Sequence, residues 1–90
     1  MQNKDYLICY DIRHSKRLSK LARYLEKEAI RIQYSIFFLP FCNKDRLYKI
    51  SQEIVDIINN ENDDVRIYEI KNYGINLGSA YDLRKINIFI

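Results

Sequence analysis

The apolar positions of this chain fall into short strand-like runs separated by segments with helical spacing. Residues 6–10 are apolar or aromatic throughout, which predicts a central strand covered on both faces. Residues 29–41 are strand-like and end near Pro40, which cannot donate to a sheet, and a turn near Tyr34 and Ser35 would divide them into two strands. Residues 65–70 and 86–90 are predicted as further strands.

Two helices are predicted between these strands. Ser15 is the expected N-cap of the first helix, whose apolar stripe comprises Leu18, Leu21, Ala22, Leu25 and Ala29. Asn43 is the expected N-cap of the second helix, whose apolar positions are Leu47, Ile50, Ile54, Ile57 and Ile58. Tyr6, Tyr10 and Tyr68 lie at strand positions where we expect them to pack rather than to stack on bases.

The order of the elements indicates an α+β fold. Strand, helix, two strands, helix and strand match the ferredoxin-like βαββαβ arrangement, an antiparallel sheet with two helices on one face. We expect a single domain over residues 1–90, with residues 72–85 as a loop that leads to strand 86–90. An unpaired terminal strand exposes a sheet edge, so we expect strand 86–90 to be exchanged between the subunits of a homodimer.

Composition favours a small globular protein. The chain has 90 residues, of which 48% are hydrophobic and 30% charged, and its apolar runs are too short for a signal segment or a membrane span. We therefore expect a cytoplasmic protein without a membrane partner. Cys9 and Cys42 lack metal-binding spacing and indicate neither a zinc site nor a disulfide framework.

The positive charge is concentrated in one block. Residues 13–31 hold seven Lys or Arg residues against two Glu, an excess of five in a chain whose net charge is +3. Such a block favours a polyanionic partner, although the outer face of a solvated helix explains Lys20, Arg23 and Lys27 equally well. Cations at a helix start oppose the helix dipole, which points to phosphate binding there. The candidate nucleic-acid-binding residues are Arg13, Lys16, Arg17, Lys20 and Arg31.

Asp11 follows the first strand directly and is the candidate catalytic and metal-binding residue. A lone Asp at a strand end is more often a turn or capping residue, and one carboxylate is a poor hydrolytic site. A two-fold axis near the first strand would pair two copies of Asp11, and Mg²⁺ can bridge such a pair. Tyr10 is a candidate for placing its hydroxyl near this site. His14 is either a proton carrier or an incidental loop residue.

Three features together resemble the CRISPR-associated protein two family. They are an apolar first strand ending in Tyr-Asp-Ile at residues 10–12, a basic helix start with Arg17, and the run Arg-Ile-Gln-Tyr-Ser-Ile-Phe at residues 31–37. The sequence departs from the commoner pattern in having Ala29-Ile30 after the first helix and apolar residues at 38–41, which puts the geometry between the first helix and the second strand in question.

The resemblance implies a ferredoxin-like homodimer whose sheets face each other, with Asp11 of each subunit at a shared Mg²⁺ or Mn²⁺ site. It implies nucleic-acid contacts by Arg17, Arg31 and Lys20, with Tyr10, Ser35 and Phe37 in support. It also implies a partnership with the CRISPR-associated protein one integrase, in which the dimer bridges integrase subunits and holds DNA.

The resemblance, together with Asp11 and the basic block, implies a CRISPR adaptation protein with Mg-dependent endonuclease activity on RNA or DNA. The alternatives are a non-catalytic DNA scaffold of the integrase complex and a related toxin-like ribonuclease without an integrase partner. A small-molecule-sensing module of the same fold is disfavoured by the basic block.

Overall fold

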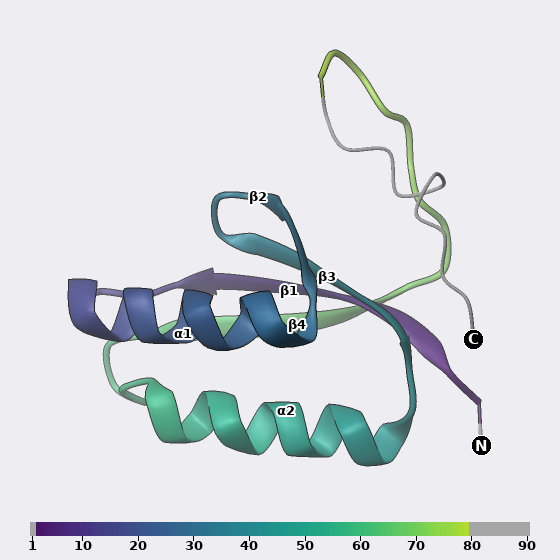
Figure 1. The fold of residues 1–90 in the computed structure, drawn as a ribbon. Helices are drawn as coiled ribbons and strands as arrows, with labels where there is room; N and C mark the ends of the chain where they lie inside the picture. Colours follow the sequence, from purple (N-terminus) through teal and green to yellow (C-terminus); the bar gives the residue numbers. More distant parts are fainter. Residues whose placement is uncertain (1, 80–90) are drawn as a thin grey trace.

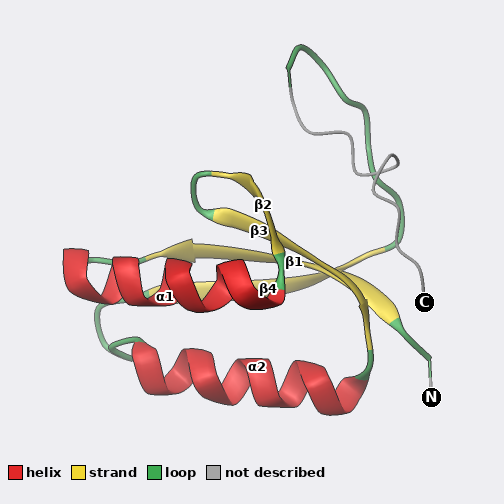
Figure 2. Ribbon diagram, in the orientation of Figure 1, coloured by secondary structure: helices red, strands yellow, loops and turns green. Residues whose placement is uncertain are grey.

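The computed structural model describes residues 2–79 and has the predicted ferredoxin-like order of elements (Figures 1 and 2). These elements are β1 (Lys4–Asp11), α1 (Ser15–Glu28), β2 (Ile30–Gln33), β3 (Ile36–Cys42), α2 (Lys44–Ile57) and β4 (Asp64–Ile70). The strands form one antiparallel sheet in the order β2-β3-β1-β4. The predicted turn at Tyr34 and Ser35 is confirmed. Strand 86–90 and its exchange lie outside the described residues.

Both helices pack on the same face of the sheet (Figure 2). Every second residue of β1 faces them, because side chains alternate along a strand, and Ile8 at its centre is completely buried. The helical stripes contribute Leu21 and Leu25 from α1 and Ile50 and Ile54 from α2. The core that results is apolar, and its other strand residues are Tyr6, Tyr10, Phe37, Leu39 and Cys42.

Among residues 2–79, the opposite face of the sheet is only partly covered, whereas the sequence predicted a β1 covered on both faces. Leu7 and Cys9 are half-buried there, and Tyr68 on the edge strand β4 is 50% exposed rather than packed. Phe38 is the exception, because the ring of Tyr73 meets it edge-on at 6.3 Å. Residues 72–79 form no helix or strand, and beyond Tyr73 they lead away from the sheet (Figure 1).

The helix starts differ in how they are capped. Asn43 caps α2 as predicted, since its side chain accepts from the backbone N–H of Arg46 at 2.8 Å. At α1 the predicted cap, Ser15, is the first helical residue, and His14 takes the cap position instead. Its Nδ1 accepts from the backbone N–H of Lys16 at 3.2 Å, which gives His14 a structural contact within the chain.

β3 contains an irregularity at the apolar stretch where the sequence departs from the commoner pattern. The register between β1 and β3 shifts between Lys4 and Tyr6, and Phe41 adopts a φ of 50°. This left-handed conformation is uncommon for a bulky residue. Asp5 supports it by accepting from the backbone N–H of Phe41 at 2.8 Å, so β3 can bend toward α2 at this point.

Among the described residues, no helix is long and apolar enough to cross a membrane.

Candidate functional site

Asp11 lies at the exposed end of β1, and its side chain is 63% accessible. Arg13, two residues further on, brings its Nη2 to 3.3 Å from the Asp11 carboxylate. Both side chains are largely solvated, so this ion pair is weak and easily exchanged for a ligand. The structure thus places the predicted carboxylate where a nucleic acid or an ion can reach it.

A second carboxylate, Asp64, lies directly across from Asp11. The two residues are partners in the antiparallel ladder of β1 and β4, so their side chains lie on the same face of the sheet. Like charges in this position repel. An arginine partly neutralises each carboxylate: Arg13 lies beside Asp11, and the Nε of Arg66 lies 3.0 Å from Oδ2 of Asp64. Asp64 is not among the site residues predicted from the sequence, because its position opposite Asp11 depends on the register of β1 and β4.

The pair offers few protein ligands to a metal ion. Within residues 2–79 no group of three or more His, Cys, Asp or Glu side chains is arranged to hold an ion. Mg²⁺ retains several waters and is commonly bound by one or two carboxylates, whereas a closed cage needs more protein ligands. The chemistry of Asp11 and Asp64 therefore fits a hydrated Mg²⁺ or Mn²⁺ ion.

Arg17 makes an internal contact. Its Nε and Nη2 donate to Asp63 at 2.7 and 3.2 Å, and the Asp63 side chain has no exposed surface. Asp63 also accepts from the backbone N–H groups of Arg13 at 2.9 Å and Asn59 at 2.8 Å. These donors, Arg17 above all, hold the pKa of Asp63 well below its usual range. We call this arrangement the Asp63 clasp; it ties α1 and the loop after β1 to the start of β4.

Arg31 belongs to an aromatic cluster at the β2–β3 turn. Its guanidinium carbon lies 5.1 Å from the ring centroid of Phe37 and 5.8 Å from that of Tyr34. Its Nη2 donates to the hydroxyl of Tyr10 at 3.4 Å, and this contact and neighbouring charges raise the pKa of Arg31. The Tyr10 hydroxyl donates to the carbonyl of Tyr34 at 3.3 Å, so it serves this cluster and lies on the other face of β1 from Asp11.

The remaining predicted cations lie on the exposed side of α1. Lys16 and Lys20 line an open groove of about 440 Å³, together with Ser15, Ser19 and Arg23. No acidic residue lines this groove, so its ammonium, guanidinium and hydroxyl groups all present donors. The groove begins at the helix start, near the end of β1 that carries Asp11 (Figure 1).

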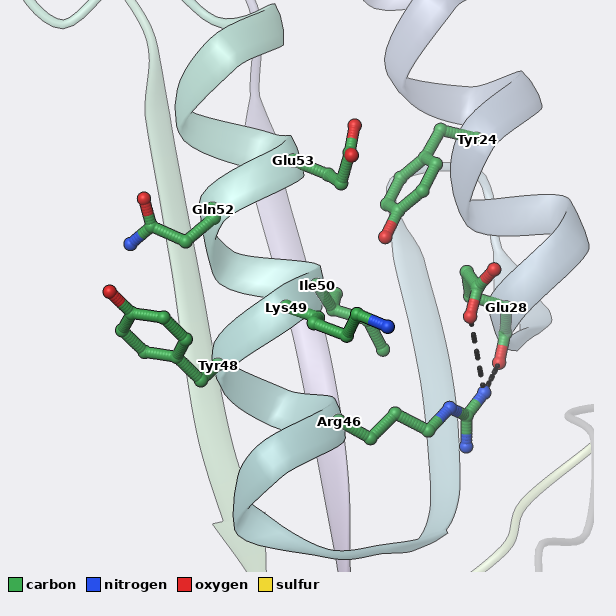
Figure 3. Close-up of a pocket in the computed structure, with 8 residues that line it drawn as sticks. All are labelled: Tyr24, Glu28, Arg46, Tyr48, Lys49, Ile50, Gln52 and Glu53. Atoms are coloured by element: carbon green, nitrogen blue, oxygen red, sulfur yellow. Dashed lines mark hydrogen bonds and ion pairs between the residues drawn. The ribbon is translucent and has the colours of Figure 1, made fainter.

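A larger hollow, of about 510 Å³, lies between the two helices and away from the sheet. Figure 3 shows Arg46 of α2 reaching across to Glu28, the last residue of α1. Arg46 donates to the main-chain carbonyl of Glu28 at 2.7 Å, which satisfies a free acceptor at the helix end. Tyr24 and Glu53 also line this hollow. Its polar groups thus join the helices, and it shares no lining residue with the groove of α1.

The fold and the carboxylate pair place the chain among small ferredoxin-like proteins with an acidic group at the end of the first strand. The sequence model described as CRISPR associated protein Cas2 matches residues 4–76. The CRISPR-associated endoribonuclease Cas2 1 of Nitrosomonas europaea is 40% identical over 72 residues, which cover 79% of this chain and 67% of that protein.

Solved structures share the fold of this chain. A hypothetical protein, TT1823 from Thermus thermophilus, superposes with a TM-score of 0.81 at 25% identity, covering 88% of this chain and 95% of that one. A chain of a partial Cas6-RT-Cas1–Cas2 complex superposes with a TM-score of 0.77 at 29% identity, with 97% of both chains covered. The protein therefore belongs to the CRISPR-associated Cas2 family.

Proposed function

We propose that this protein acts in CRISPR adaptation as a homodimeric, metal-dependent endonuclease with Asp11 at its centre. The observation that carries the proposal is the solvated Asp11 carboxylate, paired across β1 and β4 with Asp64 at the same end of the molecule as the basic groove of α1. Relatives named as endoribonucleases support phosphodiester cleavage.

Asp11 and Asp64 would hold the Mg²⁺ or Mn²⁺ ion, which supplies an activated water and offsets charge on the phosphate when bound. Lys16 and Lys20 bind the sugar–phosphate backbone, because their ammonium groups are exposed and lack an acidic neighbour in the groove. Arg31 presents a preorganised guanidinium at the β2–β3 turn, where Tyr10 and Phe37 hold it. Arg17 is held by Asp63, so we assign it a positioning role instead of a phosphate contact.

A homodimer would complete the site. The face of the sheet that carries Asp11 also carries the half-buried Leu7, Cys9 and Ile36 and the exposed Tyr68, and covering it removes apolar surface from water. A two-fold axis across this face repeats Asp11 and Asp64 in the second subunit, so the number of available carboxylates doubles.

The proposed partners are DNA or RNA and the Cas1 integrase. The likeness to a chain of a complex that contains Cas1 supports the latter. The same observation favours a second function, in which the dimer is a scaffold that bridges integrase subunits and holds DNA without cutting it. Two carboxylates in each subunit are few for efficient hydrolysis, which is also consistent with a scaffold.

Substitution of the carboxylates separates the two functions. Asp11→Asn keeps the shape and removes the charge, so Mg²⁺-dependent cleavage of labelled RNA or DNA should fall about 100-fold or more. Asp64→Asn should lower the affinity for Mn²⁺, measured by electron paramagnetic resonance. Asp45→Asn, which alters an exposed carboxylate on α2, is the matched control and should change neither quantity.

Spacer insertion by the integrase should survive Asp11→Asn if the protein is a scaffold. Cleavage at the wild-type rate by a rigorously purified Asp11→Asn protein would show that Asp11 is not the catalytic centre.

A further inference from the structure

Tyr34 is the most exposed aromatic residue near the Asp11 end of the sheet. It lies in the two-residue turn between β2 and β3 and is 74% exposed. The next residue, Ser35, accepts from the backbone N–H of Tyr10 at 3.1 Å, and Tyr10 precedes Asp11. Standard backbone spacings then limit the Cα atoms of Tyr34 and Asp11 to a separation of no more than about 13 Å. The two residues thus lie at the same end of the sheet. Asp11 is on the open face, whereas the contacts of Tyr34 with Tyr10 and Arg31 are on the helix face, so a single strand that bends around this end can reach both.

The surroundings of Tyr34 restrict how it can move. Its carbonyl accepts from the Tyr10 hydroxyl at 3.3 Å, and its ring has the Arg31 guanidinium 5.8 Å from its centroid. Arg31 is fixed in turn by the ring of Phe37, by Tyr10 and by Glu26, whose Oε2 accepts from Nη1 at 3.4 Å. The exposed ring of Tyr34 thus lies beside the oriented guanidinium of Arg31. The ring stays in water although the hydrophobic effect favours its burial.

An exposed aromatic ring beside a fixed guanidinium suits one ligand in particular. Unpaired nucleobases stack on aromatic rings, and neighbouring cations hold the phosphates that join them. A duplex offers a free base face only at its ends, so such a ring selects single-stranded or splayed nucleic acid. The excess of positive charge in residues 13–31 favours a polyanion over an apolar protein surface as the occupant.

We propose that Tyr34 stacks on an unpaired nucleobase while Arg31 contacts an adjoining phosphate, so that the β2–β3 turn positions a single strand for Asp11. This inference rests on the proposed nucleic-acid function and adds to it a base-binding residue. The stacking is indifferent to the sugar, because every base has a stacking face. The inference therefore applies to both RNA and single-stranded DNA, and the binding experiment shows which of the two the protein prefers.

Affinity measurements on Tyr34 variants test the stacking. The probes are a 12-residue oligouridylate, a 12-residue oligothymidylate and a 12-base-pair duplex with closed ends. Tyr34→Ala should weaken binding of the single strands by at least about fivefold, the lower range for one stacked base. Tyr34→Phe should restore it, and affinity for the duplex should not change. Tyr48→Ala, at a 67% exposed tyrosine on α2, is the matched control and should leave all three affinities unchanged.

The sequence contains no tryptophan, so Tyr34→Trp introduces a single fluorophore at the turn. Stacking should quench its emission in step with the binding curve of the single strands. Tyr48→Trp should show no quenching, since it lies on the helical layer. This readout reports contact directly and would not respond to a purely structural role of Tyr34.

The outcomes separate this inference from the proposed function. If the wild-type protein binds none of the probes, the nucleic-acid function fails. If the wild type binds but Tyr34→Ala binds equally well and Tyr34→Trp is not quenched, stacking is overturned and the function remains. Loss of integrase binding by Tyr34→Ala, with oligonucleotide affinity intact, would assign the turn to a protein contact and also overturn the inference. A difference between the two single strands identifies the preferred sugar.

Discussion

Asp63 receives more hydrogen bonds than any other carboxylate described in this chain. Two come from Arg17 and two from backbone N–H groups in the loops that flank the site. A buried carboxylate is costly unless its acceptors are satisfied, and here they are. The Asp63 clasp therefore fixes the loop that carries Arg13, and through it the surroundings of Asp11.

The clasp predicts a distinct acid sensitivity. The folded state lowers the pKa of Asp63, so its contribution to stability is complete above the unfolded pKa, near 3.9, and is lost as the pH falls toward the folded value. The free energy of unfolding in urea should therefore decrease below about pH 4.

Asp63→Asn tests this dependence. The variant should be less stable than the wild type at pH 7, and the difference should narrow as the pH falls below about 4. Asp45→Asn serves as the control, because Asp45 is exposed and outside the clasp. A difference between wild type and Asp63→Asn that stays constant from pH 7 to pH 2 would contradict an ionised clasp.

The role of Arg17 shows what a residue pattern leaves open. Arg13, Lys16 and Arg17 are all basic residues at the helix start, and local sequence does not distinguish their roles. They differ because the carboxylate of Asp63, 46 positions after Arg17, accepts from the guanidinium of Arg17 but only from the backbone N–H of Arg13. A partner that distant in sequence is not visible in local periodicity.

At the scale of elements, α1 has a divided surface. Leu21 and Leu25 are buried against the sheet, whereas Lys16 and Lys20 lie on the solvent side with their charges unopposed in the groove. This division is the amphipathic pattern from which the helix was predicted. The polar face is consequently available to bind phosphate.

Charge reversal on this face should reduce the salt dependence of binding. If each subunit makes about three phosphate contacts, the log–log salt slope for a dimer is near −5, and Lys16→Glu with Lys20→Glu should bring it to about −2. Affinity should fall alike for all sequences. The paired substitutions Lys44→Glu and Lys49→Glu on α2 make the same charge change elsewhere and should have much less effect. An unchanged slope would remove α1 from the binding surface.

The order and type of the elements could be predicted because each helix has an uninterrupted stripe and each strand an apolar core residue at alternate positions. The β2–β3 turn was placed correctly although no glycine marks it. The cap of α1 was predicted wrongly as Ser15. The side chains of His14 and Ser15 can both accept from a helix N–H, and only the backbone geometry decides between them. The partnership of Asp11 and Asp64 required the strand register, which periodicity does not contain.

At the scale of the whole molecule, the sheet has one face that residues 2–79 leave incompletely covered. Tyr73 covers Phe38 and donates to Asp5 at 2.5 Å, but the side of the face formed by β4 stays open at Tyr68. Antiparallel sheets tolerate one solvated face when that face is polar. The apolar residues here favour a second subunit.

A charge introduced on this face should oppose association. Tyr68→Glu should raise the dissociation constant of the dimer by at least about tenfold, since it places a charge among the apolar residues of the interface. Light scattering across a concentration series measures the shift. Tyr48→Glu, at another exposed tyrosine, is the control. A Tyr68→Glu protein that dimerises as tightly as wild type would place the interface elsewhere.

The central position of β1 has a consequence for how the protein is made. Its two neighbours, β3 and β4, come later in the chain, and Leu7 pairs with Tyr68 across 61 positions. On the ribosome, the first strand to emerge must therefore wait for the last described strand before the sheet can close. Until then the nascent chain carries an apolar strand with an unsatisfied edge, so premature termination anywhere before β4 would release a fragment prone to aggregate rather than a smaller folded domain.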